Sequence, residues 1–183
     1  WSSNKIQPLA KKLIYEKIWP ESGIISLDKG QDSLKLILDV GGADKLLRHP
    51  DGTISFLAQR FRRWESWHPR NYDDFTIRAT RPTGRLTEVD KILKGIKSGT
   101  LIAAYYAYGH VNEAENGFSR FRIIDLPKFT LAFYNQEIIP GKMIMNPDNS
   151  SGFLAWQFKD LPSKIMFFDL NRREENKQLG FNF

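Results

Sequence analysis

The 183-residue sequence contains no cysteine. Disulfide bonds and thiolate catalysis are therefore excluded, which leaves histidine and carboxylate side chains as the good metal ligands. The three histidines, His49, His68 and His110, have no spacing that suits a zinc site. Since magnesium prefers oxygen ligands, a carboxylate site for such a hard cation stays compatible with the composition.

Long apolar runs are also missing, because no stretch approaches the roughly 18 residues that a transmembrane helix needs. We therefore expect no membrane partner and an intracellular, cytoplasmic protein. The sequence also lacks a nucleotide-binding glycine loop, a serine triad and a cysteine dyad, which excludes the commonest motif-defined enzymes.

What the sequence does contain is typical of one globular domain, with 41% hydrophobic and 26% charged residues. The net charge is +6 and the pI is near 9.5. Such a balance favours a polyanionic partner, which is nucleic acid more often than an acidic membrane surface.

Hydrophobic periodicity predicts a helix over residues 4–20, because Ile6, Leu13, Ile14 and Ile18 share one face and Pro20 ends it. Residues 44–63 predict a β-hairpin with its turn at Asp51-Gly52. A second helix is expected over residues 86–99, where Thr87 is the candidate N-cap and Gly99 the stop. Residues 100–111 are apolar on both faces and predict a central strand.

Residues 34–40 predict either a strand or a buried helical turn. Further strands are expected over residues 73–81 and 118–125, the second followed by a short helix or turn, and two more near the C-terminus. This order predicts an α/β fold with a mixed central β-sheet flanked by helices. We expect an α/β core over residues 1–126 and a β-rich C-terminal extension over 127–183 that packs on the same domain.

Three features occur in the order seen in one known superfamily: Glu16 on the first helix, Asp44 at the start of the hairpin and the strand FLAQRFRR over residues 56–63. In this the chain resembles the PD-(D/E)XK nucleases, the superfamily of restriction enzymes and archaeal Holliday-junction resolvases. The resemblance covers about residues 5–126 and implies a restriction-endonuclease-like fold. It also implies a DNA endonuclease that depends on Mg²⁺ or Mn²⁺, a possible homodimer, and an origin in a virus or phage, a mobile element or a repair system.

The resemblance assigns catalytic roles to Glu16, Asp44, Gln59 and Arg60, with Glu16 and Asp44 as the metal ligands. The family places a basic residue two positions after the acid or amide of its strand motif, because alternate strand residues share a face. Here that position after Gln59 is Phe61. Arg60 stays protonated and therefore stabilises phosphoryl charge rather than acting as a base. Two functions stay open: a divergent active nuclease, and an inactive nuclease fold that binds DNA or RNA.

Arginines cluster at the end of the predicted hairpin, next to the tryptophans of WESW, and this mixture suits nucleic acid. We expect DNA as the partner, with RNA not excluded. The predicted phosphate-binding residues are Arg48, Arg62, Arg63, Arg78 and Arg81. Structural interpretations compete: Asp44 also fits a turn cap, Glu16 a solvated helix face, and Glu88 the first turn of the second helix. A virion protein that packs a genome is a third possibility.

Overall fold

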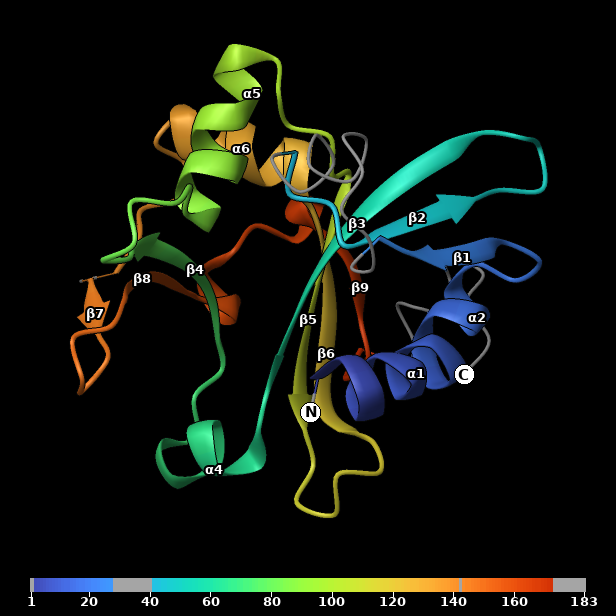
Figure 1. Ribbon diagram of the computed structural model, residues 1–183, viewed down its shortest axis with the longest axis horizontal. Coiled ribbons are helices and arrows are strands. Elements are labelled where there is room, and N and C mark those ends of the chain that lie inside the picture. The colour runs from blue at the N-terminus through green and yellow to red at the C-terminus, as the bar shows by residue number, and fades with distance from the viewer. Residues whose placement is uncertain (1, 28–40, 142, 173–183) are drawn as a thin grey trace.

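The computed structural model describes residues 2–27, 41–141 and 143–172, and its largest feature is a six-stranded sheet (Figure 1). β3 runs parallel to β5 and every other neighbouring pair is antiparallel, so the sheet is mixed. The predicted α/β class with a mixed central sheet is thereby confirmed. In spatial order the strands are β1 (Gly23–Ser26), β2 (Lys45–Arg48), β3 (Ile54–Arg62), β5 (Tyr105–Val111), β6 (Phe118–Asp125) and β9 (Met166–Asp169).

The predicted hairpin is confirmed by the antiparallel pairing of β2 with β3. Its turn contains Asp51 and Gly52, and the φ angle of +83° at Gly52 lies in the left-handed region that favours glycine. Asp51 Oδ1 accepts hydrogen bonds from the backbone N–H and the hydroxyl of Thr53. A short polar side chain that satisfies its own turn is the reason this sequence reverses direction here.

A second, three-stranded sheet was not predicted. It has the order β4 (Asp74–Thr80), β8 (Gly152–Gln157) and β7 (Ile144–Met145). Phe75 and Ile77 of β4 are fully buried and pack against the central sheet and α6 rather than extending that sheet. Local alternation predicted the strand, but it carries no information on which sheet the strand joins.

Helices cover both faces of the central sheet (Figure 1). The first and second helices lie where they were predicted, the segment after β6 forms a helix, and short single turns connect the other elements. The helical segments are η1 (Ser2–Ile6), α1 (Gln7–Ala10), η2 (Lys11–Tyr15), α2 (Glu16–Ile18), α4 (Trp64–Trp67), η3 (His68–Arg70), η4 (Asp90–Lys94), α5 (Gly95–Ser98), α6 (Leu126–Tyr134), η5 (Phe158–Asp160) and η6 (Ser163–Ile165).

Two hydrophobic cores result from the alternation along the strands. Leu57 of β3 faces the first helix, where Ile14 and its neighbours cover it. Its neighbour Ala58 faces the opposite core, which the second helix, α6 and the second sheet cover. β5 lies inside the sheet and contributes to both cores, as its apolar sequence predicted.

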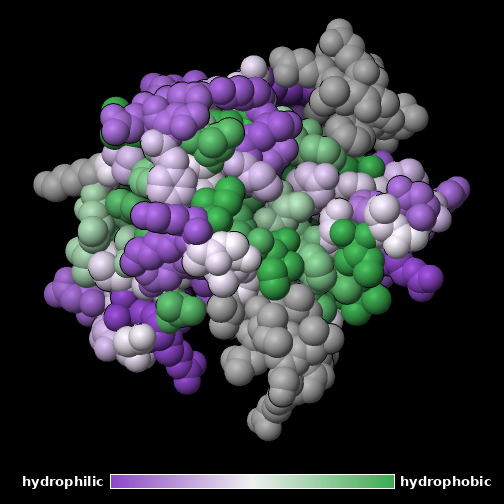
Figure 2. Space-filling model, turned by 90° about the horizontal axis from the view of Figure 1, so that it is seen from above, coloured by the Kyte–Doolittle hydropathy of each residue, from purple (hydrophilic) through white to green (hydrophobic). Residues whose placement is uncertain are grey.

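The C-terminal third takes part in both sheets, since β9 pairs with β6 and β8 pairs with β4. The strand or helical turn expected over residues 34–40 lies outside the described residues. In the part of the chain that is described, no helix has the length and apolar character to cross a membrane. Seen from above, hydrophilic residues gather over the side where α5 and α6 lie (Figure 2).

Candidate active site

Asp44 is fixed against the motif strand immediately before β2 begins. Its backbone N–H donates to the Leu57 carbonyl at 2.9 Å, and its Oδ2 accepts the backbone N–H of Gln59 at 2.7 Å. Gly41, three residues before Asp44, has no room for a side chain, because a Cβ there would lie 2.5 Å from the Ile102 side chain. The glycine pair therefore allows the chain to approach the sheet closely enough for Asp44 to reach β3.

A cavity of about 190 Å³ opens beside Asp44. The cavity lies between the start of the hairpin and the second helix. Glu88 and Lys91 of that helix line it. Gln59 and Arg81 also contribute to the wall. Two carboxylates and two cationic side chains are thereby brought together from position 44 and from positions 81–91 of the sequence.

The second helix presents these residues because of how it begins. Thr87 Oγ1 accepts the backbone N–H of Asp90 at 3.2 Å, and Asp90 Oδ2 accepts the backbone N–H of Thr87 at 2.9 Å. This reciprocal pair resembles a capping box, with aspartate as the acid. It confirms Thr87 as the N-cap. Glu88 and Lys91 then lie three residues apart, a spacing that places both on one face.

The cavity raises the pKa of Asp44 from 3.8 to about 6. Burial is the largest cause, and the negative charge of Glu88 adds to it. The Gln59 N–H bond and the charges of Lys45 and Lys91 act in the opposite direction and favour the carboxylate. A carboxyl group whose pKa is close to neutral pH, next to a second carboxyl group, is a common arrangement at functional sites.

Glu88 is the residue that sequence reasoning missed as part of the site. Its Oε2 accepts Arg60 Nη1 at 2.9 Å and the backbone N–H of Arg78 at 2.8 Å. From the sequence, Glu88 was interpreted as an acid that stabilises the helix dipole from the first turn. That interpretation did not include an ion pair with β3. The available signal was the Glu88–Lys91 spacing after a strong N-cap, but it does not specify which strand the helix faces.

Glu16 lies on the solvent side of α2, with its Oε1 4.0 Å from Lys11 Nζ and about half of its side chain exposed. The neighbouring Tyr15 points inward instead, and its hydroxyl donates to Gln59 Oε1 at 3.1 Å. The first helix therefore reaches the motif strand through Tyr15. Among the described residues, no three His, Asp or Glu side chains gather closely enough to hold a metal ion.

Of the predicted DNA-binding arginines, Arg62 forms an ion pair inside the protein, in which its Nη1 donates to Asp74 at 2.7 Å. Arg60, which was predicted to be catalytic, likewise donates to Glu88, at 2.9 Å. Arg48 and Arg63 are exposed at the ends of β2 and β3. Trp67 is buried and donates its Nε1–H to the Val111 carbonyl, so this tryptophan belongs to the core.

Of the last two predicted arginines, Arg78 does not line the cavity. Its backbone N–H donates to Glu88, and its guanidinium lies 5.7 Å from the Phe153 ring centroid. Arg81 lines the cavity, and its buried Nε has no hydrogen-bond partner in the part of the chain that is described. A buried donor without a partner is costly, so Arg81 is suited to receive an acceptor from a ligand.

Comparisons with known proteins give no match. No protein-family model, no curated protein and no solved structure matches this chain. The function is therefore argued from the geometry of the site.

Proposed function

We propose that the chain is a magnesium-dependent DNA endonuclease whose active site is the cavity beside Asp44. The observation that carries the proposal is the position of the Asp44 carboxylate, which is hydrogen-bonded to β3 and shares one cavity with Glu88 and Lys91. The order of helix, hairpin and parallel β5 supports a restriction-endonuclease-like arrangement. That fold assignment belongs to the proposal.

The donor set fits a magnesium ion. Mg²⁺ is commonly bound by one or two carboxylates, with waters and substrate phosphate oxygens as the remaining ligands. Asp44 and Glu88 would hold it, and the pKa of Asp44 is raised mainly by burial, with the negative charge of Glu88 as a further cause. Glu16, which the resemblance named as a ligand, faces solvent beside Lys11. When bound, the ion supplies Lewis acidity and a water of lowered pKa.

Phe61 occupies the position where the family has a basic residue. In the proposed site, the cationic residues of the cavity supply that positive charge. Lys91 lines the cavity and lowers the pKa of Asp44, so its positive charge acts at the place where a scissile phosphate would lie. Arg81 adds N–H donors at the cavity wall. Arg60 holds Glu88 in place through their ion pair. Fixed donors of this kind stabilise the charge that develops on a phosphoryl group.

DNA is the proposed substrate because of the net charge of +6 and the arginines around the hairpin. Arg48 and Arg63 are exposed and would bind the phosphates that flank the cleaved bond. A homodimer, as the resemblance implies, would cut both strands.

The test is plasmid cleavage by the purified protein with Mg²⁺, with Mn²⁺ and with a chelator. We expect relaxed or linear plasmid with either ion and none with the chelator. Lys91→Met should lower the rate by about 100-fold, as loss of one charge-stabilising donor does. Lys97→Met, on the exposed side of the same helix, is the matched control and should cleave like the wild type.

A catalytically inactive DNA- or RNA-binding protein is the second candidate. Two observations favour it: Phe61 occupies the motif position that requires a base, and Glu88 already pairs with Arg60. Under this alternative, the protein binds nucleic acid but cleaves no plasmid or junction substrate with either ion.

A further inference from the structure

A larger cavity, which we call the intersheet groove, lies between β3 and the second sheet. Its volume is about 470 Å³, within the range of about 300–1,000 Å³ that is usual for small-molecule sites. It shares no lining residue with the Asp44 cavity. Arg60 connects the two, because it lines the groove while its Nη1 donates to Glu88.

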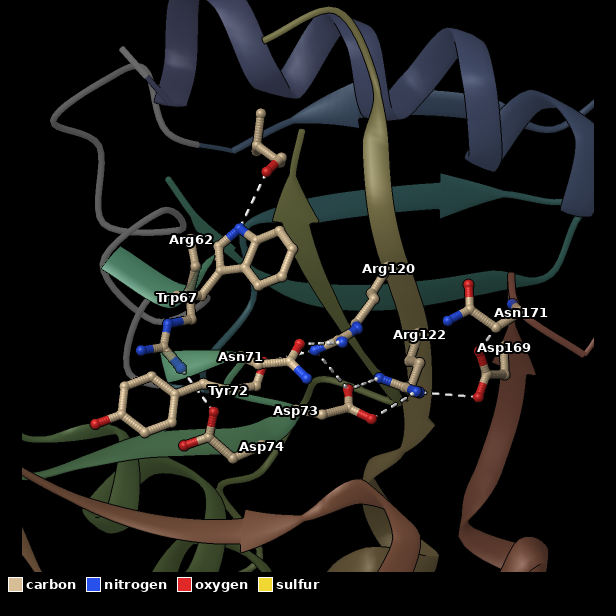
Figure 3. Close-up of polar contacts among 11 residues, drawn as sticks. Arg62, Trp67, Asn71, Tyr72, Asp73, Asp74, Arg120, Arg122, Asp169 and Asn171 are labelled. Carbon is tan, nitrogen blue, oxygen red and sulfur yellow. Dashed lines mark hydrogen bonds and ion pairs between the residues drawn. The ribbon is translucent and has the colours of Figure 1, made fainter. Parts of the chain in front are cut away.

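Aromatic rings form part of the groove wall, and each of two lies next to an arginine. The Arg60 guanidinium is 4.6 Å from the Phe153 ring centroid. The Arg62 guanidinium is 5.1 Å from the Tyr72 ring centroid, and Figure 3 shows it beside this ring and joined to Asp74. Flat aromatic and guanidinium surfaces side by side are the usual lining of sites that stack a nucleobase.

The charges of the groove favour an anion. Arg60, Arg62 and Arg63 line it, against the single carboxylate of Asp74. That carboxylate is buried and is paired with Arg62. A guanidinium has five N–H donors, so its ion pair leaves donors that can bind a phosphate.

We propose that the intersheet groove binds one unstacked nucleotide, with the base against Tyr72 and Phe153 and its phosphate at the arginines. The position of Arg63 at the open end of β3, where it is exposed, suits it for the phosphate. This binding requires neither a metal ion nor cleavage. It is therefore independent of the proposed nuclease activity, and the two are tested separately.

The test is calorimetric titration of the full chain, without divalent metal, with three probes: thymidine 5′-monophosphate, thymidine and inorganic phosphate. We expect the nucleotide to bind at least about tenfold more tightly than either part, because stacking and charge act together. Equal binding of phosphate and nucleotide would overturn the proposal, and so would the absence of nucleotide binding.

Variants separate the two halves of the site. Tyr72→Leu keeps an apolar side chain but removes the ring, and it should weaken nucleotide binding about tenfold while phosphate binding stays unchanged. Tyr72→Phe keeps the ring and should bind like the wild type, which controls for folding. Arg63→Glu should weaken both nucleotide and phosphate. Arg85→Glu reverses an exposed charge that lines neither cavity and should change nothing. If Tyr72→Leu binds as tightly as the wild type, the base does not lie in the groove.

An unstacked nucleotide occurs free or within a strand, and two further probes distinguish these sources. A 12-residue oligothymidylate that binds more tightly than the mononucleotide, with the same loss in Tyr72→Leu, identifies a single strand as the natural ligand. Equal affinities identify the free nucleotide. A 12-base-pair blunt duplex that binds while the single strand and the mononucleotide do not would contradict the proposal.

Discussion

His110 lies in β5 with its side chain fully buried, and neither ring nitrogen has a hydrogen-bond partner among the described residues. Burial, followed by the charges of Arg62, Arg120 and Arg122, lowers its pKa from 6.5 to about 3. The folded protein therefore holds neutral histidine, while the unfolded chain takes up a proton below pH 6.5. Stability that is present above pH 6.5 is lost as the pH falls towards 3.

We predict that acidification from pH 7 to 5 costs the wild type about 2 kcal/mol more than it costs His110→Phe, at 1.36 kcal/mol for each pH unit below 6.5. Urea unfolding of both proteins at the two pH values measures the difference. Parallel loss of stability in both would show that His110 titrates normally in the folded state.

The contribution of Asp44 to stability changes with pH in the opposite direction. Its pKa is raised to about 6, so the protonated form favours the folded state, and this contribution is complete below pH 3.8 and lost above pH 6. Asp44→Asn removes the buried charge and keeps an oxygen acceptor for the Gln59 N–H. We predict that the variant is more stable than the wild type by up to about 3 kcal/mol at pH 8. Thermal unfolding across pH 3.5–8 should show this gain vanish near pH 4, and a variant less stable at pH 8 contradicts the assignment.

Among single residues, the resemblance grouped Asp44 with Gln59 and Arg60. The structure joins Asp44 to the Gln59 backbone N–H, while Arg60 lines the other cavity. The sequence could not predict that Tyr15 rather than Glu16 contacts Gln59. The helical pattern places both near the same turn, and a difference of one residue, about 100°, decides which faces the sheet. Burial of Tyr15 follows from its packing against Phe121.

Between elements, an ion triad joins β6, β9 and the residue before β4 (Figure 3), and two of its members, Arg122 and Asp169, are buried. Arg122 Nε donates to Asp169 at 2.8 Å, and its Nη1 donates to Asp73 at 2.5 Å. The Arg122 side chain is only 8% exposed, so its removal leaves the Asp169 charge buried without this partner. The triad therefore connects the large sheet to the segment that enters the second sheet.

We predict that Arg122→Leu lowers the free energy of unfolding by about 3–5 kcal/mol, the range for breaking a buried pair. The triple variant Arg122→Leu, Asp73→Asn, Asp169→Asn should recover most of the loss, since the buried side chain at position 169 then carries no charge. As a control, Lys94→Ala breaks the exposed pair with Asp90 and should cost less than about 1 kcal/mol. If Arg122→Leu and Lys94→Ala lower the free energy of unfolding equally in urea, the triad stabilises the protein no more than an exposed ion pair does.

The positions of helices and strands were predicted better than the pairing of strands that lie far apart in the sequence. The hairpin follows from Asp51-Gly52, and α6 follows from Asp125, whose Oδ1 accepts the Lys128 N–H at the N-cap. Both signals act within a few residues. The second sheet depends on β4 and β8, which pair across more than 70 positions, and no local pattern specifies that pairing.

For the whole molecule, the net charge of +6 predicts DNA binding that weakens steeply with salt. Each phosphate contact contributes about 0.9 to the slope of log K against log salt concentration. We predict that Arg63→Gln reduces the magnitude of this slope by about one. Lys164→Gln removes an equal charge that pairs with Glu137 and should leave the slope unchanged. Fluorescence anisotropy with labelled duplex at four salt concentrations provides both slopes, and an unaltered slope for Arg63→Gln removes this arginine from the interface.

The most direct measurement compares plasmid cleavage with Mg²⁺ by the wild type, Asp44→Asn and Glu16→Gln, each shown to be folded and to bind DNA. The two variants make the same change from carboxylate to amide, one in the cavity and one on the solvent face of α2. The account predicts that Asp44→Asn loses cleavage by at least about 1,000-fold, as loss of a ligand to the catalytic ion should, while Glu16→Gln cleaves like the wild type. Cleavage by Asp44→Asn at the wild-type rate, or no cleavage by any of the three, would contradict it.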